Sequence, residues 1–146
     1  MQNGVIYSPA AFRRVIFDGL KIPSDACRKE GMVYCYRTDG NIWAIFDMMF
    51  SEIGIRAYGE VDRLADMTVE KIRRRAPSLI LLGNSSSATL HSASEAEVRE
   101  ETARSLRESG GTGFLPGPSN AIMAGTPVKN LFAMAEEIEK YNPMAE

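Results

Sequence analysis

Short apolar runs alternate with longer amphipathic segments along the whole chain. The runs are too short for helices and are bounded by Gly, Pro or polar turns, so they predict strands. These strands are expected at 5–7, 32–36, 55–58, 79–82 and 113–115. Run 79–82 is apolar without alternation, which is typical of a parallel strand buried on both faces, and 32–36 has the same character.

Between these runs, apolar residues recur at helical spacing and predict amphipathic helices. The helices are expected at 8–31, 42–54, 68–76, 94–109 and 126–141, with polar loops at 59–67, 83–93 and 116–125. Ser94 and Glu97 have the spacing of a capping box, and Gly110 follows the helix that they open. Gly19 and Pro23 lie inside the first helix, so we expect that helix to kink or split there.

Strands that alternate with helices indicate an α/β fold, with about four βα units after an opening strand and helix. Neither a linker nor a repeat divides the chain, so a single domain over residues 1–146 is predicted. A doubly wound sheet and part of a (β/α)₈ barrel share this pattern, and periodicity does not distinguish them. A whole barrel typically takes about 250 residues, so this chain has the length for about half of one.

Composition limits the partners. Lys and Arg number 17 against 19 Asp and Glu, so no sequence-wide basic field favours a nucleic acid. No apolar run approaches the roughly 20 residues that span a bilayer, and no signal-peptide pattern opens the chain. We therefore expect a cytoplasmic protein without a membrane partner. Two Cys and one His, in no zinc-ligand spacing, predict no metal site, and Cys35 is expected to be a buried, unreactive thiol.

In either parallel architecture, ligands bind at the carboxyl ends of the strands, and polar residues follow four of the predicted strands. Arg37 can pair with an anionic group of a small-molecule ligand, and Asp39 and Glu60 are candidate catalytic acids or bases. The candidate ligand-orienting residues are Asn41, Asn84, Ser119 and Asn120. The same residue types are ordinary in turns and caps, so a purely structural interpretation stays open for each.

Five strings resemble, in order and spacing, the C-terminal half of the uroporphyrinogen decarboxylase family, whose superfamily also contains corrinoid-dependent methyltransferases. They are YSPxxFR at 7–13, TDGNI at 38–42, LGN at 82–84, EVREE at 97–101 and GTPVxNLxAM at 125–134. The resemblance implies the last four or so βα units of a TIM (β/α)₈ barrel. It also implies a tetrapyrrole, corrinoid or methyl-carrier ligand, with a corrinoid as the candidate cofactor.

The chain departs from the family's known site patterns. A late-loop His of the decarboxylases falls at about Asn120, and a His-x-Cys pair of the zinc-dependent methyltransferases falls on Val33 and Cys35. Only Cys35 is kept. The chain is most similar to uncharacterised members with a His-Ser-Asp-Gly-Asn-like turn, in which Arg37 takes the first position and 39–41 are unchanged.

Three functions stay open. The chain is an enzyme of this superfamily that is active only when another chain supplies the N-terminal half-barrel, or it is a non-catalytic half-barrel that serves as an assembly or binding partner. The third is an unrelated doubly wound binding domain. A half-barrel has two open strand edges and exposed apolar faces, so we expect a homo-oligomer, most simply two copies about a twofold axis, or a complex with a separate N-terminal half.

Overall fold

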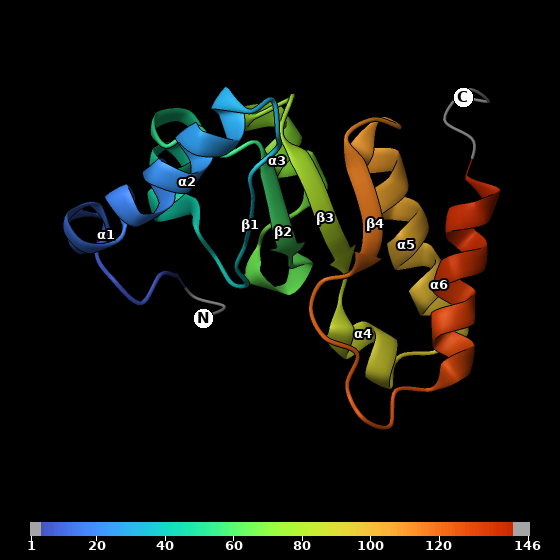
Figure 1. The fold of residues 1–146 in the computed structure, drawn as a ribbon. Coiled ribbons are helices and arrows are strands. Elements are labelled where there is room, and N and C mark those ends of the chain that lie inside the picture. The colour runs from blue at the N-terminus through green and yellow to red at the C-terminus, as the bar shows by residue number, and fades with distance from the viewer. Residues whose placement is uncertain (1–3, 142–146) are drawn as a thin grey trace.

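The computed structural model of the chain describes residues 4–141 and contains a four-stranded sheet flanked by helices (Figure 1). The strands are β1 (Cys35–Arg37), β2 (Ala57–Val61), β3 (Ile80–Ser85) and β4 (Phe114–Pro118). The α-helices are α1 (Pro9–Val15), α2 (Phe17–Lys29), α3 (Val69–Arg75), α4 (Ser87–Ser92), α5 (Glu95–Ser109) and α6 (Val128–Lys140). Shorter helical turns are η1 (Trp43–Ile45), η2 (Met48–Glu52) and η3 (Arg63–Ala65). Within this part of the chain, every helix is too short or too polar to cross a bilayer.

The strand order decides between the two architectures that periodicity left open. The strands lie in the order β1-β2-β3-β4, and every neighbouring pair is parallel. Helices α3 and α5 contact each other, α5 packs on β3 and β4, and α6 packs against α5. A doubly wound sheet reverses its strand order at a switch point, whereas a (β/α)₈ barrel adds strands in sequence. The prediction of an α/β fold that forms part of a TIM barrel is therefore confirmed.

Two rows of residues cross the sheet on opposite faces. The row toward the helices consists of Tyr36, Tyr58, Leu81 and Phe114. The row on the other side, which we call the open face, consists of Arg37, Gly59, Leu82 and Leu115. Tyr58 and Leu81 are fully buried, whereas Leu115 is 54% exposed. In a closed barrel the residues of the open face pack in layers inside the barrel, so the exposure of Arg37 and Leu115, on the two outer strands, marks the edges where further strands belong.

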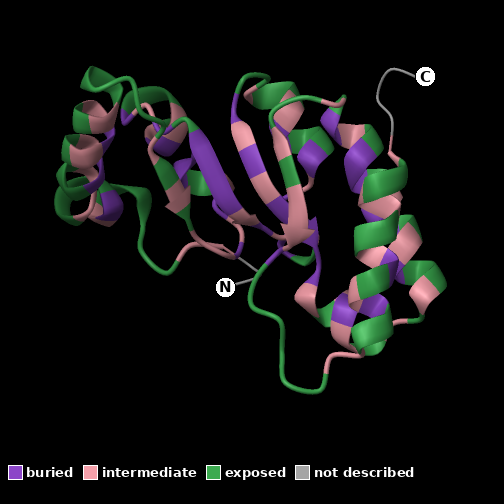
Figure 2. Cartoon of the chain, turned by 45° about the vertical axis from the view of Figure 1, so that its right-hand side comes forward, coloured by how far each residue is buried: buried purple, intermediate pink, exposed green. Residues whose placement is uncertain are grey.

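Helix ends and core positions follow the sequence closely. Both bonds of the predicted capping box form at Ser94 and Glu97, and Gly110 ends α5 in the left-handed conformation. The apolar stripe of segment 42–54 is buried, with Phe46 2% and Met49 0% exposed, although the segment forms η1 and η2 rather than one regular α-helix. The predicted apolar side chains are therefore buried even though the segment forms a different type of helix from the one predicted. Figure 2 colours the chain by burial.

Several predictions for the N-terminal part of the chain need correction. Residues 5–7 form no strand, because no neighbouring strand pairs with them. The first helix splits as predicted, but at Ile16 rather than at Gly19 or Pro23, and Pro23 lies inside α2. The predicted buried strand 32–36 is reduced to β1, and Cys35 is exposed, which corrects the expectation of a buried thiol. Cys35 is two residues before Arg37 in β1 and so lies on the open face, and a strand is buried on both faces only when other layers cover both faces of the sheet.

The predicted loops are shorter than expected because the strands extend into them. Strand β2 continues to Val61, β3 to Ser85 and β4 to Pro118, and the small polar residues after β3 form α4. Backbone pairing with a neighbour holds these residues in strands although their side chains are not typical of strands. Proline lacks the N–H of a ladder, and its presence in β4 fits an edge position.

Candidate functional site

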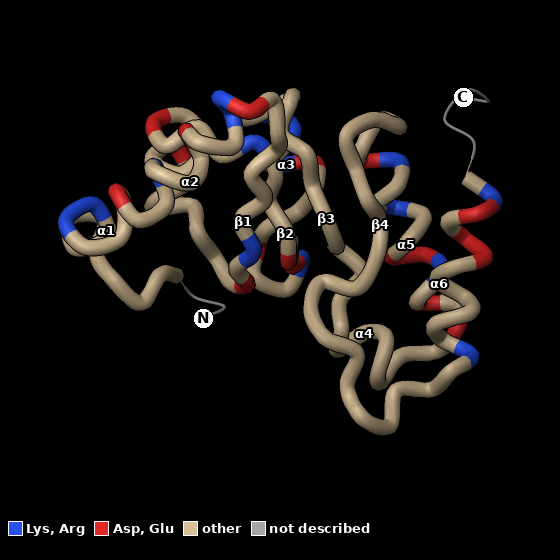
Figure 3. The backbone as a smooth tube through the Cα atoms, in the orientation of Figure 1, with Lys and Arg blue, Asp and Glu red and all other residues tan. Residues whose placement is uncertain are grey.

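Charged residues gather at the carboxyl ends of β1 and β2 (Figure 3). Arg37 ends β1 and pairs in register with Gly59 of β2. The register shifts between Gly59 and Val61, and Glu60 between them has a φ of 65°. This bulge places the Glu60 carboxylate beside Arg37, with 3.3 Å between Arg37 Nη2 and Glu60 Oε1. A β-bulge changes the direction of a side chain, and here it brings the Glu60 carboxylate beside the Arg37 guanidinium.

A second pair links the two edges of the sheet. The Asn120 side chain donates to Asp39 Oδ2 at 3.5 Å, across 81 positions of sequence. Asp39 follows β1 and is half-buried, and Asn120 follows β4 and is exposed. The loop after β4 therefore reaches back across the carboxyl end of the sheet. We call Arg37, Asp39, Glu60 and Asn120 the carboxyl-end cluster.

Sequence reasoning missed Tyr58, whose side chain lies near this cluster. Its hydroxyl is buried and has no hydrogen-bond partner among the described residues. Burial raises the pKa of Tyr58, and the negative charges of Asp62, Asp39 and Glu60 raise it further. The phenol is therefore neutral at physiological pH and can act only as a neutral hydrogen-bonding group. No sequence signal marked it, because an aromatic residue in a predicted strand is ordinary core.

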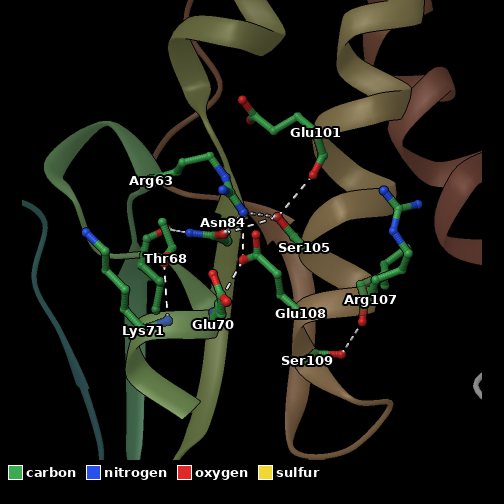
Figure 4. A network of polar contacts seen from close by, with 12 residues as sticks. Arg63, Thr68, Glu70, Lys71, Asn84, Glu101, Ser105, Arg107, Glu108 and Ser109 are labelled. Atoms are coloured by element: carbon green, nitrogen blue, oxygen red, sulfur yellow. Dashed lines mark hydrogen bonds and ion pairs between the residues drawn. The ribbon is translucent and has the colours of Figure 1, made fainter. Parts of the chain in front are cut away.

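Asn84 lies apart from the cluster, between the sheet and the helices (Figure 4). It is 0% exposed, and its amide nitrogen donates to the Met67 carbonyl at 3.0 Å and the Val61 carbonyl at 3.4 Å. Its oxygen accepts from Ser105 Oγ at 3.1 Å and from Arg63 at 3.2 Å. Such a residue anchors the turn after β2, and its polar atoms are already used.

The Arg63 guanidinium completes this network. It pairs with Glu108 at 2.8 Å, and only 15% of each side chain is exposed. The Glu108 carboxylate also accepts from the backbone N–H of Glu70 at 3.3 Å, so the network joins η3, α3 and α5 (Figure 4). These contacts fix the segment that follows Glu60 at the carboxyl end of β2.

Two further predicted site residues are engaged locally. The Asn41 side chain accepts from the Trp43 backbone N–H at 3.2 Å, at the first residue of η1. Ser119 is 3% exposed, and its hydroxyl accepts from the Ser87 N–H at 3.3 Å. Asn41 also borders a pocket of about 140 Å³ that Asp39 and the N-terminal segment line. Among residues 4–141, no group of three His, Cys, Asp or Glu side chains could hold a metal ion.

The carboxyl-end cluster combines three chemical abilities. Arg37 offers a permanently charged fork of N–H donors that suits a carboxylate or phosphate. Asp39 and Glu60 can take up or release a proton, and Asn120 can donate and accept hydrogen bonds without titrating. Together these groups can bind an anionic ligand and move a proton at the mouth of a parallel α/β barrel. The architecture is that of part of a (β/α)₈ barrel, and the cluster is its candidate ligand-binding site.

Comparison with known families identifies which barrel. The family model "Uroporphyrinogen decarboxylase (URO-D)" matches residues 2–141. The chain belongs to the uroporphyrinogen decarboxylase family, which confirms the resemblance found in its sequence strings. No curated protein matches the chain.

Among solved structures, the chain is similar to a methyltransferase from Methanosarcina mazei, with 23% identity and a TM-score of 0.72. The similarity covers 92% of this chain and 38% of the methyltransferase chain. At this identity the match shows a shared fold. The chain therefore spans well under half the length of the protein that it resembles in structure.

Proposed function

We propose that this chain forms the C-terminal part of the mouth of a uroporphyrinogen decarboxylase-family barrel with methyltransferase-like chemistry. Its ligand is a tetrapyrrole, a corrinoid or another methyl carrier. The convergence of Arg37, Asp39, Glu60 and Asn120 carries the proposal, because the three strand ends that supply them are far apart in sequence. Four strands cannot close a barrel, so activity requires the remaining strands, from polypeptide outside these residues or from another chain.

Each residue of the cluster has a proposed role. Arg37 binds an anionic group at the rim of the ligand, and its guanidinium stays charged at any physiological pH. Asp39 and Glu60 hold or accept the proton that the reaction moves, and Asn120 orients the ligand and Asp39. Ser119 supports this loop through its contact with Ser87.

A corrinoid fits this cluster by its rim rather than by its metal. Arg37, Asp39, Glu60 and Asn120 include neither the imidazole nor the thiolate that ligates cobalt-like ions, whereas Arg37 and Asn120 supply donors for peripheral amides and phosphate. A bound corrinoid would supply a methyl-accepting metal centre, and Arg37 and Asn120 would hold its rim.

The proposal is tested by spectral titration with uroporphyrin III and, separately, with hydroxocobalamin. We expect binding weaker than micromolar by the isolated chain, because half of the cleft wall is absent and pockets normally bury most of a ligand. Replacing Arg37 with Ala should weaken uroporphyrin binding by about tenfold or more, the loss expected for a charge-assisted contact. Asp39→Asn should reduce activity of the completed barrel while largely preserving binding.

Matched control variants separate these effects from changes in overall charge. Arg74→Ala removes an exposed cation of α3, and Glu139→Gln removes an exposed carboxylate of α6. Both controls should bind like the unaltered chain. If neither ligand binds, or if Arg37→Ala binds as well as the unaltered chain, the proposal fails. Binding of a complementary half-barrel without any ligand would instead favour the non-catalytic assembly role.

One observation favours that assembly role as a second candidate. Large apolar side chains are exposed at both edges of the sheet. They are Met32 (55%) and Val33 (44%) before β1, and Leu115 (54%) in β4. On α6, Val128 (63%) and Phe132 (62%) are also exposed. Soluble monomers rarely leave such groups uncovered, so we propose that a second copy or an N-terminal half-barrel chain covers these edges.

A further inference from the structure

Gly59 lies in the open face between Arg37 and Leu82. The position of the Arg37 side chain explains why this residue is glycine. A Cβ at Gly59 would lie 2.8 Å from Arg37 Cγ, 3.4 Å from Cδ and 3.5 Å from Nε. The Arg37 side chain therefore runs along the bare backbone of β2. The φ of Gly59 lies outside the left-handed region, so its backbone conformation does not require glycine.

Most hydrogen-bond donors of the Arg37 guanidinium have no partner within residues 4–141. The Arg37 side chain is 61% exposed, and Glu60, 23% exposed, is its partner at 3.3 Å. Within residues 4–141, this single ion pair is the only polar contact that the structure gives the guanidinium. A guanidinium has five N–H donors in a planar fork, so most of its capacity is left for an oxyanion.

We infer that Gly59 is a positioning residue for Arg37. Its missing side chain lets Arg37 cross β2 and hold its guanidinium beside Glu60, where it takes a carboxylate or phosphate of the ligand. The choice of an oxyanion rests on the proposed function, whereas the dependence of the Arg37 position on Gly59 does not. Any Cβ at this position displaces the aliphatic stem of Arg37 and moves the guanidinium away from Glu60.

The test compares Gly59→Ala with Gly117→Ala. Gly117 lies in β4, a Cβ there meets no atom within 4 Å, and its φ is outside the left-handed region, so it is a matched control. The first measurement is the rate at which phenylglyoxal modifies Arg37, followed by mass spectrometry. A nearby carboxylate slows this reaction because it pairs with the guanidinium and covers nitrogens that the reagent attacks. Gly59→Ala should therefore speed it about two- to fivefold, the range for an exposed ion pair.

Glu60→Gln should speed the modification equally, and Gly117→Ala should leave it unchanged. An unchanged rate in Gly59→Ala overturns the inference whatever the ligand experiments show. The second measurement is uroporphyrin III binding, a carboxylate probe, with hydroxocobalamin as the phosphate-bearing probe. Gly59→Ala should lose about as much affinity as Arg37→Ala, and the double variant should lose no more than Arg37→Ala alone.

The outcomes separate this inference from the proposed function. If the unaltered chain binds neither probe, the proposed function fails, and the modification rates still decide the role of Gly59. If the loss of affinity in the double variant equals the sum of the losses in the two single variants, Gly59 acts independently of Arg37 and the inference is overturned. Should Gly59→Ala fail to fold, the Gly59→Ala/Arg37→Ala variant should fold again, because the colliding side chain is gone. A double variant that stays unfolded would refute the inference.

Discussion

Replacing Asn84 with Ala tests whether this residue is an anchor of the fold. Asn84 is fully buried. The substitution removes the donor to the Met67 carbonyl and the acceptor for Ser105 and Arg63. The two shorter bonds contribute about 1–1.5 kcal/mol each when a buried partner is left unsatisfied. Asn84 also has a φ of 83°, which Asn tolerates, whereas Ala there costs about 1 kcal/mol more.

The expected loss in the free energy of unfolding is therefore about 3–4 kcal/mol, a large part of a typical domain stability. Asn84→Gly loses the same bonds but adopts the left-handed backbone freely, so it should lose about 1 kcal/mol less. Urea unfolding, followed by far-UV circular dichroism and by the fluorescence of Trp43, measures both. Asn120→Ala is the exposed control and should stay within about 0.5 kcal/mol of the unaltered chain.

Two results would refute this reasoning. A loss below about 1 kcal/mol in Asn84→Ala would mean that water replaces the bonds and that the network does not anchor the turn. Equal losses in Asn84→Ala and Asn84→Gly would show that the backbone conformation carries no strain. The first result would reopen a ligand-binding role for Asn84.

Further predictions concern stability, metal content and assembly. Ser94→Ala should destabilise the fold by about 1 kcal/mol in urea unfolding, the usual worth of an N-cap. Hydrogen bonds from Ser94 lower the pKa of Glu97, so its contribution to stability is complete above the ordinary value of 4.5 and is lost as the pH falls through the lowered pKa. Acid titration of Ser94→Ala should show less of this loss, and an identical acid profile would count against it. Purified protein should contain substoichiometric zinc, and stoichiometric zinc that disappears in Cys35→Ser would contradict the absence of a zinc site. Sedimentation at micromolar concentration should show association, as expected for uncovered sheet edges, and a compact 16.1 kDa monomer would argue against such edges.

The position of Cys35 shows where sequence reasoning stops. Its apolar neighbours predict burial, and the strand they predict does form in part. The thiol is nevertheless exposed, although partial desolvation raises its pKa and Arg37 opposes that rise. Whether a strand face is covered depends on chain that lies elsewhere in space, and a local apolar pattern carries no information on that neighbour.

The candidate site divides in the same way. Sequence placed Arg37, Asp39, Glu60 and Asn120 after strands, and parallel topology explains why strand ends converge. Sequence did not show that Asn84 turns toward the helices, because its side chain direction follows from the irregular backbone at Gly83 and Asn84. Nor did it reveal Tyr58, whose buried hydroxyl has no hydrogen-bond partner within residues 4–141.

The amino-acid sequence by itself determined the alternation of strands and helices, the capping of α5, the buried stripe of 42–54 and the family. Each of these depends on residues near one another along the chain, or on strings that keep their order. Only the tertiary structure decided the strand order, the open face, and the pairs Arg37–Glu60 and Asp39–Asn120. These features join distant segments, and their geometry is set by strand register and by one bulge in β2, which no local pattern of side chains encodes.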